Sequence, residues 1–346
     1  MNLRVPQLRF EPADELAALC KAGGDPLRLN VLRALSNDSF GVLELAQIFD
    51  IGQSGMSHHL KVLAQAGLVA TRREGNAIFY RRALSAATTG LGGKLHSALL
   101  DEVDELQLPD AVLTRIAQVH SQRAAASQDF FARNAGSFQA QQDLIAGLAQ
   151  YRDSVLALLD ALGFDATANA LEIGPGDGGF LPELANRFHS VTALDNSQAM
   201  LDLARLQCEK HALGNVKLQL ADALNDDYSA ADCVVMNMVL HHFAAPAEAL
   251  KQLATRVTPG GSLLITELCS HNQSWARQAC GDLWLGFEQD DLAQWAIAAG
   301  LNPGESLYVG LRNGFQIQVR HFAKPEQHSG SGVQVRAQPI SPTGIN

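Results

Sequence analysis

The chain has few cysteines, and none of them are paired at the spacing of a zinc knot or a redox motif. Its five cysteines, Cys20, Cys208, Cys233, Cys269 and Cys280, are scattered along 346 residues. Without a CxxC spacing they indicate neither a disulfide framework nor a cysteine-based metal site. The pattern fits a reducing compartment, so we expect a cytoplasmic protein that holds no metal.

Long apolar runs are also missing. No stretch of about 18 apolar residues is present, so we expect no membrane span. The N-terminal sequence MNLRVPQLRFEPADELAAL has no basic start followed by an apolar core, and we expect no secretion signal. Hydrophobic residues nevertheless make up 47% of the chain, enough for the buried cores of two domains.

The charge is unevenly distributed. The net charge of −10 is unfavourable for binding DNA, but nearly all of the acidic excess lies in residues 151–346. Residues 53–82 contain one acid, Glu74, and a group of basic residues: Lys61, Arg72, Arg73, Arg81 and Arg82. Because the local field attracts phosphates, this segment is suited to nucleic acid despite the net charge.

Residues 26–82 have the pattern of a helix–turn–helix followed by a β-hairpin. VLELAQIF (42–49) is an apolar periodic stretch, and the turn DIGQS leads from it into a second helix within QSGMSHHLKVLAQAGLV (53–69), which Gly67 ends. LVATRREGNAIFYRRAL (68–84) then alternates as two strands around a turn at EGN. The sequence therefore predicts a basic wing after a helix–turn–helix.

The second of these helices separates its apolar and polar residues. Met56, Leu60 and Leu63 fall on one face, which can enter a core. The residues expected to contact bases and phosphates in a major groove lie on the polar side, namely Gln53, Ser54, Ser57, His58 and Lys61, with Arg72 and Arg73 on the wing. An ordinary solvated helix face is the alternative interpretation.

The adjacent histidines His58 and His59 do not form a metal site in this pattern. Successive helical residues point in directions about 100° apart, so the two side chains cannot easily grip one ion. No carboxylate or nucleophile lies nearby in sequence to complete a catalytic set.

QSGMSHHLKVLAQAGLV followed by RREGNAIFYR resembles the winged helix–turn–helix of the ArsR/SmtB family of bacterial repressors, over about residues 15–90. The resemblance implies a DNA-binding domain at residues 1–90, a double-stranded DNA operator as partner, and a homodimer. Many members of that family sense metals through cysteines in the preceding helix. That helix is VLELAQIF here and has no cysteine, so we expect DNA binding without metal sensing.

Residues 91–150 are predicted to form a helical linker. Leu95, Leu99, Val103 and Leu106 repeat at the spacing of a packing seam. The seam fits an internal core helix or a dimer interface, and the family resemblance favours the dimer.

A glycine-rich turn begins the second half. In NALEIGPGDGGFLPELANRF (169–188), Glu172 precedes Gly174, Gly176 and Gly178 as ExGxGxG, between an expected strand and an expected helix. Glycines permit a tight turn and a close approach of the backbone to a ligand. An acid at this point would repel a pyrophosphate but attract the ammonium of S-adenosylmethionine (SAM), so the pattern favours SAM over NAD.

The ends of the following strands carry the other candidate ligand-binding residues, which are Asp195, Asn196, Asp222, Ala223 and Asn237. Asp195 lies where an acid can grip both ribose hydroxyls, and Asp222 is placed to accept the adenine amino group. The repeated strand–helix order predicts a parallel, doubly wound sheet. ESLYVGLRNGFQIQVRHFA (305–323) is expected to close it as an antiparallel hairpin.

Together ExGxGxG, Asp195, Asp222 before Ala223, and TPGG (258–261) resemble class I SAM-dependent methyltransferases over about residues 150–323. The resemblance implies a Rossmann-like domain at residues 151–323 that binds SAM or S-adenosylhomocysteine (SAH). The expected fold is therefore a two-domain α/β chain, similar to methyltransferase domains fused to ArsR-type domains in bacterial regulators. Residues 324–346, rich in Gly, Ser and Pro, are expected to be a flexible tail.

His241 and His242 follow the strand that carries Asn237, where a base could reach a methyl group. A purely structural hydrogen-bonding role is the alternative for one of them. The Asn/Asp-Pro-Pro-Tyr motif is missing, so methylation of DNA adenine is not supported.

Three functions follow from this sequence. The leading one is a DNA-binding transcriptional regulator whose second domain senses SAM or SAH. The alternative is an active small-molecule methyltransferase with an attached DNA-binding domain. A pure enzyme whose winged helix only mediates dimerisation comes third, because the basic wing argues against it.

Overall fold

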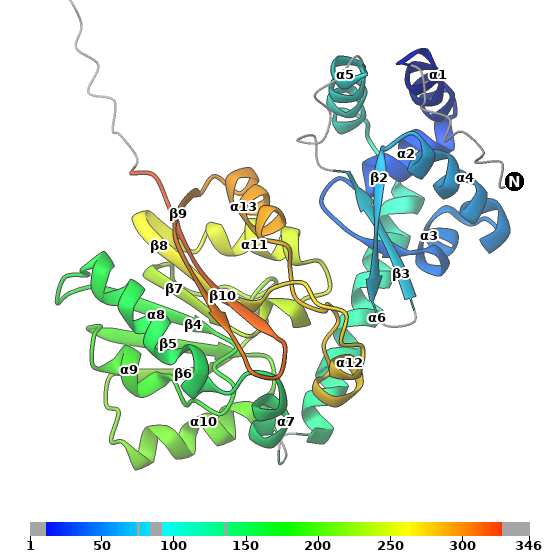
Figure 1. The fold of residues 1–346 in the computed structure, drawn as a ribbon. Helices are drawn as coiled ribbons and strands as arrows, with labels where there is room; N and C mark the ends of the chain where they lie inside the picture. The colour runs from blue at the N-terminus through cyan, green and yellow to red at the C-terminus, as the bar shows by residue number, and fades with distance from the viewer. Residues whose placement is uncertain (1–11, 75–76, 84–91, 135, 137, 327–346) are drawn as a thin grey trace, which may run out of the picture.

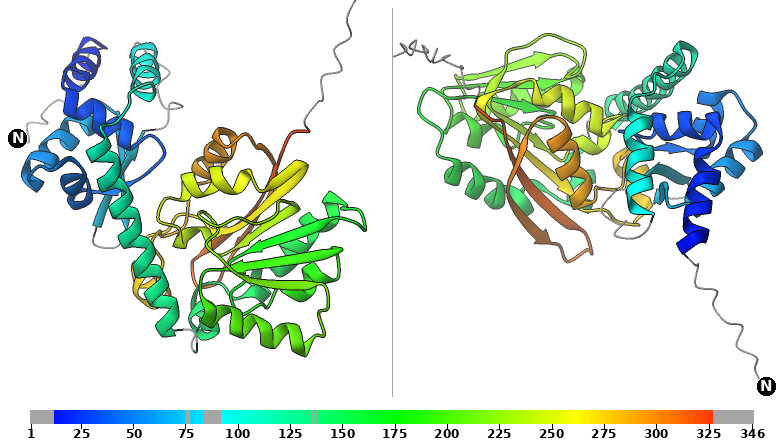
Figure 2. Two further views of the ribbon diagram at one scale, coloured as in Figure 1. Left: turned by 180° about the vertical axis from the view of Figure 1, so that it is seen from behind. Right: turned by 90° about the horizontal axis from the view of Figure 1, so that it is seen from above.

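Two β-sheets organise the protein in the computed structural model, which describes residues 12–74, 77–83, 92–134, 136 and 138–326. A three-stranded sheet belongs to the N-terminal domain and a seven-stranded sheet to the C-terminal domain (Figure 1). The long helix α6 (Asp110–Asn134) runs from one domain to the other, as the left view in Figure 2 shows.

The N-terminal domain is a helix–turn–helix with a wing. Its helices are α1 (Pro12–Gly23), α2 (Pro26–Ala34), α3 (Val42–Phe49), α4 (Gln53–Gln65) and α5 (Gly93–Asp104). Its strands are β1 (Phe40–Gly41), β2 (Val69–Glu74) and β3 (Ala77–Arg82), in the order β1-β3-β2. The wing is the antiparallel pair β2–β3.

Helix α4 has the two faces that its sequence predicts. Met56, Leu60 and Leu63 are fully buried in the core of the domain, each contributing about 1.5–3 kcal/mol by leaving water. Ser57 and Lys61 are exposed. The apolar stripe thereby fixes the polar stripe toward solvent, because a helix has only one orientation that buries all three apolar side chains.

The C-terminal domain is a doubly wound sheet in the order β6-β5-β4-β7-β8-β10-β9. Its strands are β4 (Asn169–Ile173), β5 (Ser190–Asp195), β6 (Val216–Leu220), β7 (Ala231–Asn237), β8 (Val257–Leu268), β9 (Asn302–Gly310) and β10 (Gln316–Ala323). The first five run parallel, β10 is antiparallel to β8, and β9 is antiparallel to β10. The predicted two-domain α/β fold is confirmed.

Helices cover both faces of this sheet. They are α7 (Phe138–Ile145), α8 (Leu148–Leu162), α9 (Leu181–Ala185), α10 (Gln198–Lys210), α11 (Pro246–Ala254), α12 (Trp275–Cys280) and α13 (Gln289–Ala298), with a 3-10 turn, η3 (Leu240–His242). In β7, Cys233 and Val235 enter the core beneath α8 and α9, whereas Val234 and Met236 enter the core beneath α11 and α13. Alternation thus buries the strand on both sides. Within the described residues, no helix has the length and apolar character needed to cross a membrane.

Candidate functional site

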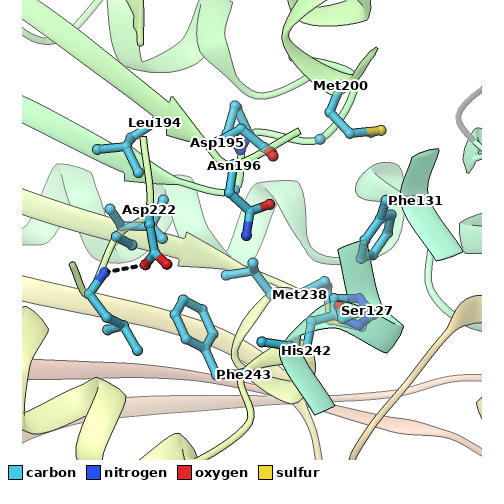
Figure 3. Close-up of a pocket in the computed structure, with 18 of the residues that line it drawn as sticks. Ser127, Phe131, Leu194, Asp195, Asn196, Met200, Asp222, Met238, His242 and Phe243 are labelled. Atoms are coloured by element: carbon cyan, nitrogen blue, oxygen red, sulfur yellow. Dashed lines mark hydrogen bonds between the residues drawn. The ribbon is translucent and has the colours of Figure 1, made fainter. Parts of the chain in front are cut away.

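A cavity of about 560 Å³ opens at the carboxyl ends of the parallel strands, a volume suited to a cofactor-sized ligand. It lies beside β4, the strand from which the sheet order runs outward in both directions. Open α/β sheets bind ligands at this switch point because the loops after the two neighbouring strands diverge there. Figure 3 shows side chains from several of these loops and from α6 around it.

Most of the predicted ligand-binding residues line this cavity, namely Glu172, Gly174, Gly176, Asp195, Asn196, Asp222, Ala223 and Asn237. Gly178 does not. A Cβ at Gly178 would come within 2.8 Å of the Cα of Ala204 on α10. Gly178 therefore allows the loop to pack closely against a helix, which gives this glycine a structural role.

The glycine turn needs its residue types. Gly174 has φ +64° and Gly176 has φ +60°, a region that side-chain-bearing residues rarely adopt. A Cβ at Gly174 would also stand 2.4 Å from the Cγ2 of Val239. The bare backbone therefore lies at the cavity wall, where it can approach a ligand closely.

Glu172 is the most unusual group in the cavity. It is 2% exposed, and its Oε1 accepts a long hydrogen bond of 3.5 Å from the Asn237 amide. Its Oε2 is buried and has no hydrogen-bond partner among the described residues. Burial raises the pKa of Glu172 to about 8. A buried acid with an unused oxygen is suited to a cationic ligand, because a cation would offset the cost of its desolvation.

Asp195 and Asp222 lie on neighbouring loops but differ in how far hydrogen bonds already use their carboxylate oxygens. Asp195 Oδ1 accepts from the Ser197 amide at 2.8 Å, and burial raises the pKa of Asp195 to about 6. The two oxygens of Asp222 accept from the Leu224 amide and the Asn225 side chain, each at 2.8 Å (the first is dashed in Figure 3). Asp222 thus orders its own loop, and Asp195 has more capacity for a ligand.

The structure separates the two histidines. His241 does not line the large cavity; its Nδ1 lies 2.8 Å from Glu267 Oε2 and its Nε2 lies 3.6 Å from Asp282 Oδ1. Burial alone would lower the pKa of His241, but these two carboxylates raise it to about 9. His241 is therefore held in an ion pair with Glu267, which also accepts from the His241 backbone N–H, and it does not take the predicted catalytic position in the cavity.

His242 does line the cavity, and Figure 3 places it beside Ser127 and Met238. Its Nδ1 lies 3.3 Å from the Gly281 carbonyl, so Nδ1 donates and Nε2 is left as the basic nitrogen. Burial and the neighbouring charge of His241 hold the pKa of His242 well below its usual value. His242 is therefore a neutral imidazole at physiological pH.

The sequence did not predict the wall that α6 forms over the cavity. Ser121, Ala124, Ser127 and Phe131 recur every three or four residues along α6 and all line the cavity, and Figure 3 shows Ser127 and Phe131 on this helix. The signal was present as small residues at helical spacing in the Ala-rich linker. It did not identify what those residues would face.

The residues predicted to bind DNA are arranged as two groups. Gln53, Ser54, Ser57, His58 and Lys61 are all exposed on α4. Arg72, predicted as a wing contact to phosphate, instead donates to the carbonyl oxygens of Leu285 at 2.7 Å and Gly286 at 2.5 Å in the C-terminal domain. Arg72 shares one side of the wing with its cross-strand partner Phe79, and this is the side that packs against that domain. The side chain of Arg73 lies outside the described part.

Two family profiles match the chain, one on each side of α6. A helix-turn-helix domain matches residues 24–72 and a methyltransferase domain matches residues 140–304. The biofilm growth-associated repressor of Agrobacterium fabrum is 45% identical over 71 residues, which are 20% of this chain and 61% of that protein. Residues 24–72 are therefore a helix-turn-helix domain similar to that of ArsR-type repressors, and residues 140–304 are a methyltransferase domain.

The methyltransferase domain also has relatives in sequence and structure. An uncharacterized methyltransferase of Mycobacterium bovis is 34% identical over 135 residues, or 36% of this chain, and the match spans 66% of that relative's length. Magnesium protoporphyrin IX methyltransferase from Synechocystis, solved with bound SAH, superposes with a TM-score of 0.50 at 18% identity. That match covers 58% of this chain and 99% of the solved chain, and it supports the Rossmann-like fold.

Proposed function

We propose that this protein is a DNA-binding transcriptional regulator whose methyltransferase domain binds SAM or SAH as its effector. The observation that carries the proposal is the position of α6. One end of this helix is fixed to the helix-turn-helix domain, and its other end forms a wall of the ligand cavity. A ligand that touches α6 therefore acts on an element that belongs to both domains.

The cavity residues fit SAM and SAH. The unused Oε2 of Glu172 suits the ammonium of the methionine part, and the bare backbone at Gly174 and Gly176 lets the ligand approach. Asp195 suits the ribose hydroxyls, and the loop ordered by Asp222 would border the adenine. The neighbouring Asn196, Ala223 and Asn237 complete the proposed contacts.

The connection from α6 to the helix-turn-helix domain is made by polar side chains. His120 Nε2 lies 2.6 Å from Asp38 Oδ2, and Arg115 donates to the Ile48 carbonyl at the end of α3. Helix α3 in turn packs on α4, which carries the exposed DNA-contact stripe. A shift of α6 would thus reach α4 through a single intervening helix.

We also propose how the domains of such a regulator divide its functions. Residues 1–90 would bind a double-stranded operator, residues 91–150 would link and dimerise two copies in the cytoplasm, and residues 151–323 would bind the ligand. Of the predicted seam, Val103 is buried and Leu95 and Leu99 pack against the core of the helix-turn-helix domain, so only Leu106, which is 37% exposed, is available to a second copy. Sedimentation of the purified protein would measure the dimer directly.

The test is a substitution in the α6 wall. Ala124→Leu would push three carbon atoms into the cavity and should lower SAH affinity at least about tenfold, because overpacking displaces the ligand. Ala126→Leu is the matched control, since Ala126 is exposed on the same helix and does not line the cavity. Calorimetry measures affinity, and operator titration with and without SAH measures coupling. Equal SAH affinity in both variants would contradict the assignment of the site.

One observation supports a second function, an active small-molecule methyltransferase. His242 is a neutral imidazole that lines the cavity with Nε2 as its basic atom. Such a group can take a proton from an acceptor while the methyl group moves from the SAM sulfur, which leaves SAH. Incubation with methyl-labelled SAM and small-molecule extracts tests this: turnover that His242→Gln abolishes would favour the enzyme, and turnover that survives would exclude His242 as the base.

A further inference from the structure

The wing presents one face to the methyltransferase domain. Strand pairing sets Arg72 opposite Phe79 and Ala70 opposite Arg81. Because side chains alternate across a strand, these four residues share one side of the hairpin, and Thr71, Tyr80 and Arg82 share the other. The side that carries Arg72, Phe79 and Arg81 is called the docking face below.

Each large side chain of the docking face contacts the other domain. Arg72 donates to the carbonyls of Leu285 and Gly286. Phe79 meets the ring of Trp284 edge to face at 5.3 Å. Arg81 pairs with Asp291 on α13, whose side chain is 4% exposed. The wing is thus attached by two charge-assisted contacts and an aromatic pair, which together form a specific interface.

The segment that receives the wing also borders the ligand cavity. Residues 281–287, called the docking loop, are tied to η3 and the residue after it. The Leu283 amide donates to the His241 carbonyl at 3.1 Å, and the Trp284 indole donates to the Phe243 carbonyl at 2.8 Å. His242 and Phe243 line the cavity. The backbone of residues 241–243 therefore lies between the cavity and the docking loop.

We propose that wing docking is an autoinhibitory contact. The docked wing cannot bind DNA, and SAM or SAH in the cavity stabilises the docked form. This inference rests on the proposed function and gives it a direction, since the ligand would release the operator. In the docked form Arg72 is paired with carbonyl oxygens and Arg81 with Asp291. DNA phosphates would have to compete for them.

The ligand favours docking because it would touch both partners. The cavity is lined on one side by α6, which is held to the helix-turn-helix domain, and on the other by His242 and Phe243, which hold the docking loop. A molecule between them gains contacts that exist only when the two domains are together. It therefore binds the docked form more tightly and shifts the population toward it.

Asp291→Asn tests the proposal without altering the wing. Asp291 does not line the ligand cavity and belongs to the methyltransferase domain, so direct loss of a ligand or DNA contact cannot explain an effect. The matched control is Asp104→Asn. Asp104 pairs with Arg82, the next residue of the wing, but within the helix-turn-helix domain.

Asp291→Asn should raise ligand-free operator affinity at least about fivefold and weaken SAH binding, because the two equilibria are linked. Asp104→Asn should change neither. Fluorescence titration of a labelled operator and calorimetry with SAH measure the two affinities, and thermal unfolding confirms that both variants fold. If Asp291→Asn proves unstable, Trp284→Leu removes the aromatic contact instead.

The outcomes separate two kinds of failure. Wild-type protein that binds neither SAM nor SAH would remove the proposed function. Wild-type protein in which SAH weakens DNA binding, with Asp291→Asn and Trp284→Leu both unchanged in both affinities, would remove wing docking alone. SAH that tightens operator binding in the wild type would reverse the direction and also overturn the proposal.

Discussion

Arg123 of α6 and Glu44 of α3 form a two-pronged ion pair, with Nε to Oε1 at 2.9 Å and Nη2 to Oε2 at 2.7 Å. The same guanidinium donates to the Ala244 carbonyl at 2.8 Å, beside the ligand cavity. Its Cζ also lies 5.0 Å from the centre of the Trp284 ring. The Arg123 side chain therefore contacts α3, the rim of the cavity and the docking loop.

Replacing this arginine should uncouple the domains. Arg123 is 9% exposed, so Arg123→Met should cost about 3 kcal/mol, at the low end of the range for buried pairs because Glu44 is partly exposed. Arg133 on the same helix pairs with Asp129 in solvent, and Arg133→Met should cost less than about 1 kcal/mol. Urea unfolding measures both. Similar losses in the two variants would show that Arg123 is not a junction.

The elevated pKa of Glu172 predicts that ligand affinity depends on pH. With a pKa of about 8, Glu172 is mostly protonated at pH 7 in the free protein. The ammonium of SAM or SAH favours the ionised carboxylate, so binding releases a proton. Affinity should therefore rise from pH 6 toward pH 8, by up to about tenfold per unit. Calorimetry in two buffers of different ionisation enthalpy would detect the released proton.

Glu172→Gln supplies the control for this pH dependence. The amide cannot ionise, so affinity should be lower and nearly flat between pH 6 and pH 8. A variant that keeps the slope of the wild type would assign the titration to another group, such as Asp195, whose pKa burial raises to about 6.

The two strand-end acids should contribute unequally. Asp195→Ala should remove a charge-assisted contact to ribose, worth about 1.5–3 kcal/mol or roughly 10- to 150-fold in affinity. Asp222→Ala should cost less, because the Asp222 carboxylate is already used by Leu224 and Asn225. NADH should not bind. Tight NADH binding without any response to SAM would mean that the glycine loop holds a pyrophosphate.

The exposed stripe of α4 should read DNA. Alanine at Ser57, His58 and Lys61 should abolish specific operator binding and leave SAH affinity and folding intact, since all three side chains are exposed. Arg73→Ala should weaken binding to all sequences and flatten its salt dependence. Gel-shift assays at several salt concentrations separate these effects. Undiminished operator affinity in the triple variant would remove the assignment of the recognition helix.

The sequence alone determined the features that depend on local pattern. Met56, Leu60 and Leu63 fell on one face because helical periodicity is set by backbone geometry, and their burial followed. The acid, glycine turn and strand-end acids of the second domain lie within single strand–loop–helix units. Parallel strands bring such loops to one edge of the sheet, so Glu172 and Asp195 could be placed in one cavity from their order in the chain.

Only the tertiary structure decided which surfaces meet. Alternation states that successive residues of a wing strand point to opposite sides, but it does not state which side another domain covers. Arg72 donates to the Leu285 carbonyl, and Ser127 of α6 lines the same cavity as Glu172. These contacts join segments distant along the chain, and they depend on the path of α6 between two folded domains. No periodicity encodes that path, because it results from packing both domains at once.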